Sequence, residues 1–116
     1  MRVDGSRSAL NPGRLRHRVT IEHKVVTGRD SFGADQFEWQ TFCTCYMNIT
    51  AMQGRELEVA QQRWADARYK CESQFIEGVR HEMRINRNGR YLEIMDVQDP
   101  FGMRDRMVYY CREWVK

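Results

Sequence analysis

The feature that most constrains the fold of this chain is an alternation of apolar and polar residues that recurs over most of its length. Residues 15–22 read LRHRVTIE, in which Leu, His, Val and Ile would share one face of a strand that can extend to residue 26. Similar patterns predict further strands over residues 36–49, 68–76, 81–86, 91–97 and 103–114. The chain is therefore expected to be mainly β.

Turn residues separate these strands and favour antiparallel neighbours. Residues 27–35 form a turn-rich segment between the first two strands, with residues 28–35 as the hairpin tip. Asn88-Gly89 predicts a type I′ turn, because both central residues of that turn need positive φ. Pro100 marks another turn, since proline fixes φ. Five to six antiparallel strands of this kind predict a small β-barrel or two-sheet sandwich.

One segment, residues 54–67, departs from the pattern of strands and turns. It carries apolar residues at helical spacing on an otherwise polar surface, namely Leu57, Ala60, Trp64 and Ala67. This predicted helix lies in a long loop, residues 50–67, between the second and third strands. A small β-domain does not need such a helix to close its core. The loop and helix are therefore the first candidate functional region.

The length of 116 residues predicts one domain. We expect residues 1–13 to be a flexible N-terminal arm, because they hold few apolar side chains, and residues 14–116 to form the single folded domain. The net charge of +3 is mildly basic and well short of that of a dedicated nucleic-acid binder. The sequence has no apolar stretch of membrane-spanning length and no recognisable signal peptide, which favours a reducing cytoplasm.

Residues suited to catalysis or metal binding are few. Cys43 and Cys45 share one face of a strand, Cys71 and Cys111 are isolated, and no CxxC pair occurs. Small buried hydrophobes are the favoured interpretation of these cysteines. His17 is expected on the inner face of the first strand, and the other histidines have no His or Cys at ligand spacing. We therefore expect no enzymatic activity, no cofactor and no metal site.

Arginines recur on the outward faces of the predicted strands. They form two possible rows: Arg14, Arg16 and Arg18, and then Arg104, Arg106 and Arg112. The favoured interpretation is a solvated face that deters stray strand pairing. Contact with nucleic acid or with an acidic partner is the alternative, and a ring of several copies would multiply the positive excess around one axis.

A set of short motifs occurs in a fixed order along residues 13–113. The set comprises GRLRHRVTI at residues 13–21, Phe32-Gly33, Trp39, Gly54-Arg55-Glu56, Arg87, Gly89-Arg90-Tyr91, Ile94, Val97, Asp99-Pro100-Phe101-Gly102 and Cys111-Arg112-Glu113. This order resembles that of the head–tail joining proteins of tailed phages, also called head-closure or stopper proteins. Residues 1–12 extend beyond the usual start of that family, and Tyr46 stands where its members often have Trp.

The resemblance implies a structural virion protein and a small β-barrel with a long loop between its second and third strands, here residues 50–67. Such a protein would assemble as a ring, commonly of six copies, beneath the portal–adaptor complex. The ring would close the DNA exit channel after packaging and present a docking surface to the tail. Its implied partners are the portal or adaptor ring, a tail-completion (terminator) or tail-tube protein, and packaged double-stranded DNA without sequence preference. Assembly would take place in the bacterial host cytoplasm, without a membrane.

Within that interpretation, the helix and the hairpin tip supply the candidate site residues. We expect Leu57 and Trp64 to dock the helix on the barrel. The polar residues that surround them are candidates for a channel gate or an inter-subunit brace: Gln53, Arg55, Gln61, Gln62, Arg63 and Arg68. Arg29, Phe32 and Asp35 are candidates for contact with a neighbouring ring. An ordinary turn, with Phe32 folded back on its own hairpin, is the alternative for the tip.

The competing functional class is a free nucleic-acid-binding β-barrel similar to an OB-fold. That class uses aromatic residues on an exposed sheet face for base stacking. Four tyrosines are available for it, although the alternation places several of them inward: Tyr69, Tyr91, Tyr109 and Tyr110.

Overall fold

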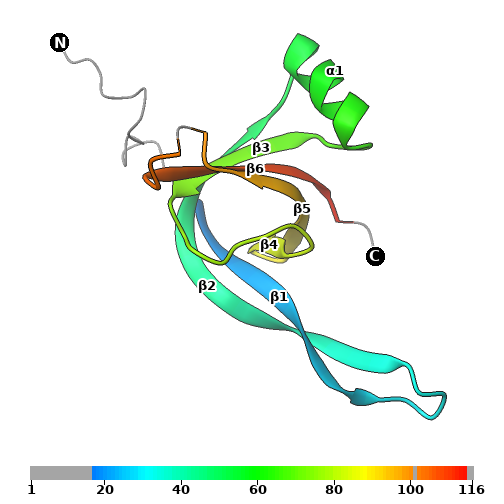
Figure 1. Ribbon diagram of the computed structural model, residues 1–116. Helices are drawn as coiled ribbons and strands as arrows, with labels where there is room; N and C mark the ends of the chain where they lie inside the picture. Colours follow the sequence, from blue (N-terminus) through cyan, green and yellow to red (C-terminus); the bar gives the residue numbers. More distant parts are fainter. Residues whose placement is uncertain (1–16, 101, 115–116) are drawn as a thin grey trace.

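The computed structural model describes residues 17–100 and 102–114, where six strands and one helix form a mainly β fold (Figure 1). The strands are β1 (His17–Arg29), β2 (Asp35–Ala51), β3 (Tyr69–Gln74), β4 (Arg84–Arg87), β5 (Arg90–Gln98) and β6 (Arg106–Glu113). The helix, α1 (Gly54–Arg63), lies between β2 and β3, as predicted. The predicted mainly β fold with one helix is confirmed. The arm predicted over residues 1–13 lies outside the described residues.

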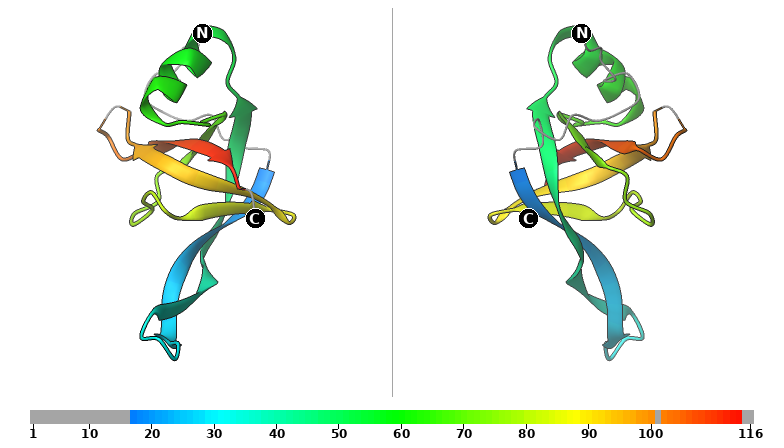
Figure 2. Two further views of the ribbon diagram at one scale, coloured as in Figure 1. Left: turned by 90° about the vertical axis from the view of Figure 1, so that its right-hand side faces the viewer. Right: turned by 90° about the vertical axis from the view of Figure 1, so that its left-hand side faces the viewer.

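The strands form one antiparallel sheet that closes on itself in the order β1-β2-β3-β6-β5-β4. Residues 20–22 of β1 pair with residues 84–86 of β4, and this pairing closes the barrel. After Glu22, β1 is paired with β2, and the two strands run on as a long hairpin to Arg29 and Asp35. Figures 1 and 2 show this hairpin projecting from one side of the barrel and α1 from the opposite side.

The interior of the barrel is filled by the inward-facing residues of the strands. Val19 and Ile21 are buried, as the alternation in residues 15–22 predicts. The largest fully buried side chain belongs to Tyr109, whose hydroxyl lies 2.8 Å from the hydroxyl of Ser73. This hydrogen bond satisfies both polar groups, which allows them to lie in an otherwise apolar core.

The helix is shorter than the sequence predicts. α1 ends at Arg63, and Trp64 has an extended backbone conformation although its N–H still makes a helix-type hydrogen bond. Asp66 adopts a φ of 67°, so the helical path cannot continue. The side chain of Gln61 donates to the carbonyl of Ala67 at 2.9 Å and holds the turn that leads to β3. The prediction that Ala67 belongs to the helix is therefore wrong, although Ala67 is buried in the same small cluster.

The two hairpin turns differ in how closely they follow the prediction. Asn88 and Gly89 have φ values of 52° and 87°, as a type I′ turn requires, and β4 and β5 pair on either side of them. The tip of the long hairpin is tighter than predicted, because the two strands extend further and leave only residues 30–34 for the turn.

The prediction that Cys71 and Cys111 are isolated is wrong. β3 and β6 are neighbours, and the two sulfur atoms lie 3.9 Å apart in the core. Both residues are buried free thiols. A separation of 40 residues hides this contact in the sequence, because only the strand order of the closed sheet brings β3 beside β6.

Gly78 is a position where the fold requires glycine. Its φ is +93°, and a Cβ atom there would lie 3.0 Å from the ring of Phe42. We expect Gly78→Ala to lower the free energy of unfolding by about 1–3 kcal/mol, because backbone strain adds to this contact. Gly28→Ala is the matched control, since nothing lies within 4 Å of its Cβ position. Urea denaturation measures both variants, and an unchanged stability of Gly78→Ala would contradict the prediction.

Candidate functional site: two protruding surfaces

α1 is attached to the barrel by a small aromatic cluster. The ring of Trp64 stacks on the ring of Tyr110 in β6, with centroids 5.0 Å apart and planes 18° from parallel. The guanidinium of Arg63 lies 4.8 Å from the centre of the Trp64 ring. Leu57 packs against the same cluster, in which Ala60 is the buried residue of α1. The structure thus places both predicted docking residues, Leu57 and Trp64, at the contact between helix and barrel.

The polar candidates around α1 are exposed. Gln53 precedes the helix, and its side chain makes no capping hydrogen bond. The side chains of Arg55, Gln62 and Arg63 are also exposed. Near the start of the helix, the Lys70 ammonium lies 3.2 Å from a Glu56 carboxylate oxygen. This partly exposed ion pair adds little to the attachment of the helix.

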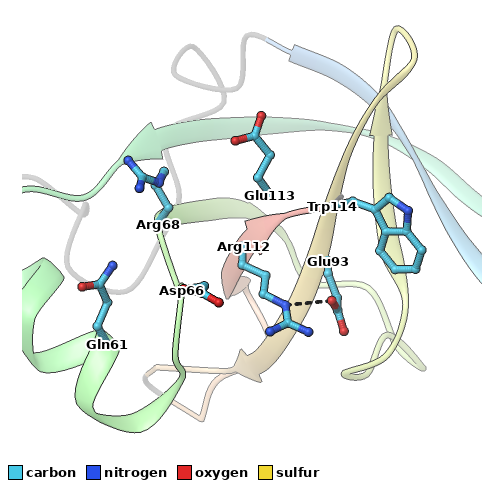
Figure 3. A pocket seen from close by; sticks show the side chains of 7 residues that line it. All are labelled: Gln61, Asp66, Arg68, Glu93, Arg112, Glu113 and Trp114. Carbon is cyan, nitrogen blue, oxygen red and sulfur yellow. Dashed lines mark hydrogen bonds and ion pairs between the residues drawn. The ribbon is translucent and has the colours of Figure 1, made fainter. Parts of the chain in front are cut away.

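A polar groove of about 460 Å³ lies where the end of α1 meets β5 and β6 (Figure 3). It is lined by Gln61, Asp66, Arg68, Glu93, Arg112, Glu113 and Trp114. The guanidinium of Arg112 donates to Glu93 at 2.9 Å (Figure 3). The groove brings two predicted residues, Gln61 and Arg68, together with residues that the sequence did not assign to a site. Their proximity depends on the pairing of β6 with β3 and β5, which sequence spacing does not reveal.

A second groove of about 320 Å³ lies between α1 and β6 and is called the α1–β6 groove below. Its apolar lining comes from Val59, Ala60, Trp64 and Tyr110, and its polar lining from Arg55, Glu56, Arg63 and Gln98. The carboxylate of Glu56 is already paired with Lys70. The two arginines therefore give the edge of this groove a positive excess. Both arginines and Trp64 were predicted site residues, whereas no sequence pattern pointed to Val59 or to a contact between Tyr110 and the helix.

The tip of the hairpin is a hydrogen-bonded turn that presents one aromatic side chain. The carboxylate of Asp30 accepts hydrogen bonds from the backbone N–H groups of Phe32 at 2.8 Å and Ala34 at 3.0 Å. Arg29 and Asp35 form an ion pair of 3.5 Å across the base of the turn. Phe32 is 94% exposed. Its side chain is therefore not folded back on its own hairpin.

The root of the hairpin carries a charged and aromatic network that the sequence did not predict. Arg84 donates to Glu22 at 2.7 Å, and their side chains are only 11% and 15% exposed. The Arg84 guanidinium lies 4.3 Å from the ring centre of Trp39 and 4.0 Å from that of Tyr91. Trp39 in turn meets Trp114 edge-on, with 5.4 Å between centroids. The network links β1, β2, β4 and β5 and fixes the point at which the hairpin leaves the barrel.

Two arginines of the second predicted row, Arg106 and Arg112, are paired within the sheet, whereas Arg104 is largely exposed. Arg106 pairs with Glu72 at 3.3 Å, Arg112 pairs with Glu93 at 2.9 Å, and both arginines are half-buried. Their charge is compensated within the sheet, so they offer little to a nucleic acid. Of the first row, Arg14 and Arg16 lie outside the described residues.

The four tyrosines considered for base stacking do not form an exposed platform. Tyr109 is buried and Tyr69 packs against the core. The rings of Tyr91 and Tyr110 are engaged in the two aromatic clusters described above. These contacts disfavour an OB-like mode of binding, which needs free ring faces.

Three thiols of the barrel have raised pKa values, which makes them weak nucleophiles near neutral pH. Burial raises the pKa of Cys45 to about 12 and also raises the pKa of Cys43 and Cys111. Among residues 17–100 and 102–114, no group of three or more His, Cys, Asp or Glu side chains could hold a metal ion. The same part of the chain contains no helix of the length and apolarity needed to cross a membrane.

The described chain is thus a small closed barrel from which a long hairpin and one helix protrude. The sequence matches the phage head completion protein family over residues 10–113. Because this match spans most of the chain, the protein belongs to that family. Its role is therefore a structural one in completing the phage head, which the resemblance noted in the sequence also implies.

Two solved structures share the fold. Protein SF1141 from Shigella flexneri 2a is 25% identical, with a TM-score of 0.74 over 92% of this chain and 99% of that chain. A chain in the virion of a native gene transfer agent particle is 16% identical, with a TM-score of 0.63 over 89% of this chain and 98% of that chain. No protein with a curated description matches the sequence. The family assignment supports a location in the virion.

The raised thiol pKa values predict slow alkylation of the folded protein. A thiol with a pKa of about 12 is roughly 0.01% thiolate at pH 8, whereas an unfolded cysteine is about one quarter thiolate. We expect iodoacetamide at pH 8 to modify Cys45 at least about tenfold more slowly in the native protein than in urea. The native rate should rise with pH, because deprotonation produces the reactive thiolate. Peptide mass spectrometry measures both rates, and equal rates would contradict the assignment.

The network at the hairpin root predicts a strong effect of Arg84→Ala. This change leaves the carboxylate of Glu22 with low exposure and without its cationic partner, so we expect a loss of about 3 kcal/mol in the free energy of unfolding. Arg90→Ala is the matched control, because the Arg90–Glu113 pair is exposed and should contribute less than about 1 kcal/mol. Urea denaturation gives both values. Similar losses of stability in the two variants would contradict the larger contribution that we assign to the Arg84–Glu22 pair.

Proposed function

We propose that this protein forms a ring, commonly of six copies, beneath the portal–adaptor complex. The ring closes the DNA exit channel after packaging and offers a docking surface to the tail. The observation that carries this proposal is the mounting of α1. This polar helix stands on the side of the barrel opposite the hairpin and is attached mainly through one aromatic stack (Figure 2). A subunit of a neck ring needs contacts in two opposite directions, and the two protrusions are suited to supply them.

A channel stopper must hold DNA under pressure and later let it pass. A segment with two stable positions is sufficient for this task, and covalent chemistry is not required. α1 suits the task because Ala60 is its buried residue and the rest of the helix is largely exposed. Burial of Leu57 and Trp64 contributes at most about 2–3 kcal/mol each. A displacement of α1 is therefore costly for one subunit and accessible when all subunits of a ring move together.

The polar residues of this region would then face the channel or a neighbouring subunit. In the proposal, the exposed residues Gln53, Arg55, Gln62 and Arg63 gate the channel or brace the next subunit. Gln61 and Arg68 contribute from the polar groove. The positive side chains would attract packaged DNA without sequence preference, and this attraction would weaken at high salt.

The hairpin tip is the second contact surface in this proposal. Arg29, Phe32 and Asp35 would reach beyond their own barrel to a neighbouring subunit or ring. The portal–adaptor complex on the head side and a tail-completion or tail-tube protein on the other side complete the set of partners. Assembly would take place in the host cytoplasm, with the finished ring at the neck of the virion.

Deletion of residues 53–66 tests the role of the helix directly. Ala51 pairs with Tyr69, and the N–H of Met52 donates to the carbonyl of Arg68 at 2.9 Å, so the two ends of the deletion already lie side by side. We expect heads with this variant to package DNA and then lose it, because the segment that closes the channel is absent. The amount of nuclease-resistant DNA per purified head measures retention.

Glu58→Ala is the matched control for the deletion, since Glu58 is exposed on α1 and lines neither groove. Heads with this variant should retain their DNA. The purified deletion variant should also unfold cooperatively, which shows that the barrel is intact. Full DNA retention by heads that carry the deletion would contradict the proposed role of α1.

A further inference from the structure

The proposed function leaves open which molecule receives the hairpin tip. We infer that Phe32 of one copy inserts into the α1–β6 groove of the next copy. This inference rests on the proposed ring and identifies its inter-subunit contact. It assigns a second copy of this chain, and not an adaptor or tail protein, as the partner of the tip.

The tip is built to present Phe32 outward. Its ring has the highest exposure of the large hydrophobic side chains in the described chain, at 94%. The two hydrogen bonds from the turn to the Asp30 carboxylate fix the backbone on both sides of the ring. A turn whose backbone is fixed before binding loses less conformational entropy when it binds. Exposed aromatic residues of this kind commonly anchor protein interfaces.

The α1–β6 groove has a suitable size and lining for an aromatic ring. An apolar cavity of about 150 Å³ is large enough to hold benzene, and this groove measures about 320 Å³. The stacked rings of Trp64 and Tyr110 line the groove together with Val59, which is 48% exposed. Insertion of Phe32 would cover apolar surface that a single copy leaves in water.

The charges of the two surfaces are complementary. At the tip, Arg29 is paired with Asp35, so the carboxylate of Asp30 leaves a negative excess beside Phe32. At the groove, Glu56 is paired with Lys70, so Arg55 and Arg63 leave a positive excess. Opposite charges around an apolar anchor guide association and fix its orientation.

The positions of tip and groove permit a ring. The hairpin and α1 project from opposite sides of the barrel (Figure 2). A contact between the tip and the groove beside α1 therefore joins different surfaces of the two copies. Such a contact repeats from copy to copy and closes when the rotations add to a full turn. The seven residues from His23 to Arg29 span roughly 20 Å at about 3.3 Å per residue, which carries the tip past its own barrel.

Photo-crosslinking in assembled particles tests the inference. We expect p-benzoylphenylalanine at position 32 of the full chain to give a covalent dimer of this protein under ultraviolet light. Mass spectrometry should locate the attachment within α1 or β6, near Val59, Trp64 or Tyr110. The same photoreactive residue at Thr44, which is exposed on β2, is the matched control and should not label that groove.

Any other product of the probe at position 32 overturns the inference. A cross-link to a different protein of the particle would assign the tip to a neighbouring ring and leave the proposed function intact. A cross-link to another surface of this chain, or no cross-link, would remove the groove as the receptor. Absence of this protein from the neck would instead contradict the proposed function itself.

A double-mutant comparison provides a second measurement. We expect Phe32→Ala and Val59→Ser each to lower the yield of DNA-filled, tailed particles about tenfold, and the double variant to be no worse than either. Val26→Ser is the matched control, because Val26 is also exposed, at 60%, but lies on the shaft of the hairpin. The purified variants should unfold like the parent protein. Independent, multiplicative losses from Phe32→Ala and Val59→Ser would contradict their direct contact.

Discussion

The direction in which the long hairpin leaves the barrel depends on the ion pair between Arg84 and Glu22. These residues are Cα partners at the last register position that joins β4 to β1, so they mark the end of barrel closure. Trp39, Tyr91 and Trp114 surround the guanidinium and keep water away from the pair. Low exposure makes the loss of one partner costly, because the other charge remains in a poorly solvated place. The hairpin consequently leaves the barrel in one defined direction.

α1 is attached in a different way from the hairpin. The hairpin continues two strands of the sheet, whereas the helix depends on the Trp64–Tyr110 stack and on a few apolar contacts. Segments with little buried apolar surface open at a lower free-energy cost than the core that carries them. In the proposed role, a stable barrel would carry a segment that moves more easily than the core, as a channel closure that later releases DNA requires.

The sequence predicts this fold to the extent that local patterns determine it. The alternation around Val19 and Ile21 and the Asn88-Gly89 turn predicted strands and a hairpin correctly, because one strand or one turn contains the whole signal. The predicted helix extends beyond the observed one, since its end depends on the backbone conformation of Asp66. The hairpin-root network was missed, because its members come from five separate parts of the chain and meet only after the sheet closes. The contact of Trp64 with Tyr110 was missed for the same reason.

The central claim is that one barrel directs α1 toward the DNA channel and the hairpin tip toward a neighbouring subunit. A cryo-electron microscopy reconstruction of the neck of DNA-filled particles tests this claim most directly. The account predicts a ring of this chain beneath the portal–adaptor complex, with α1 facing the channel and each hairpin tip in contact with a neighbouring subunit. A ring with α1 on its outer rim and the tips in solvent would contradict the account.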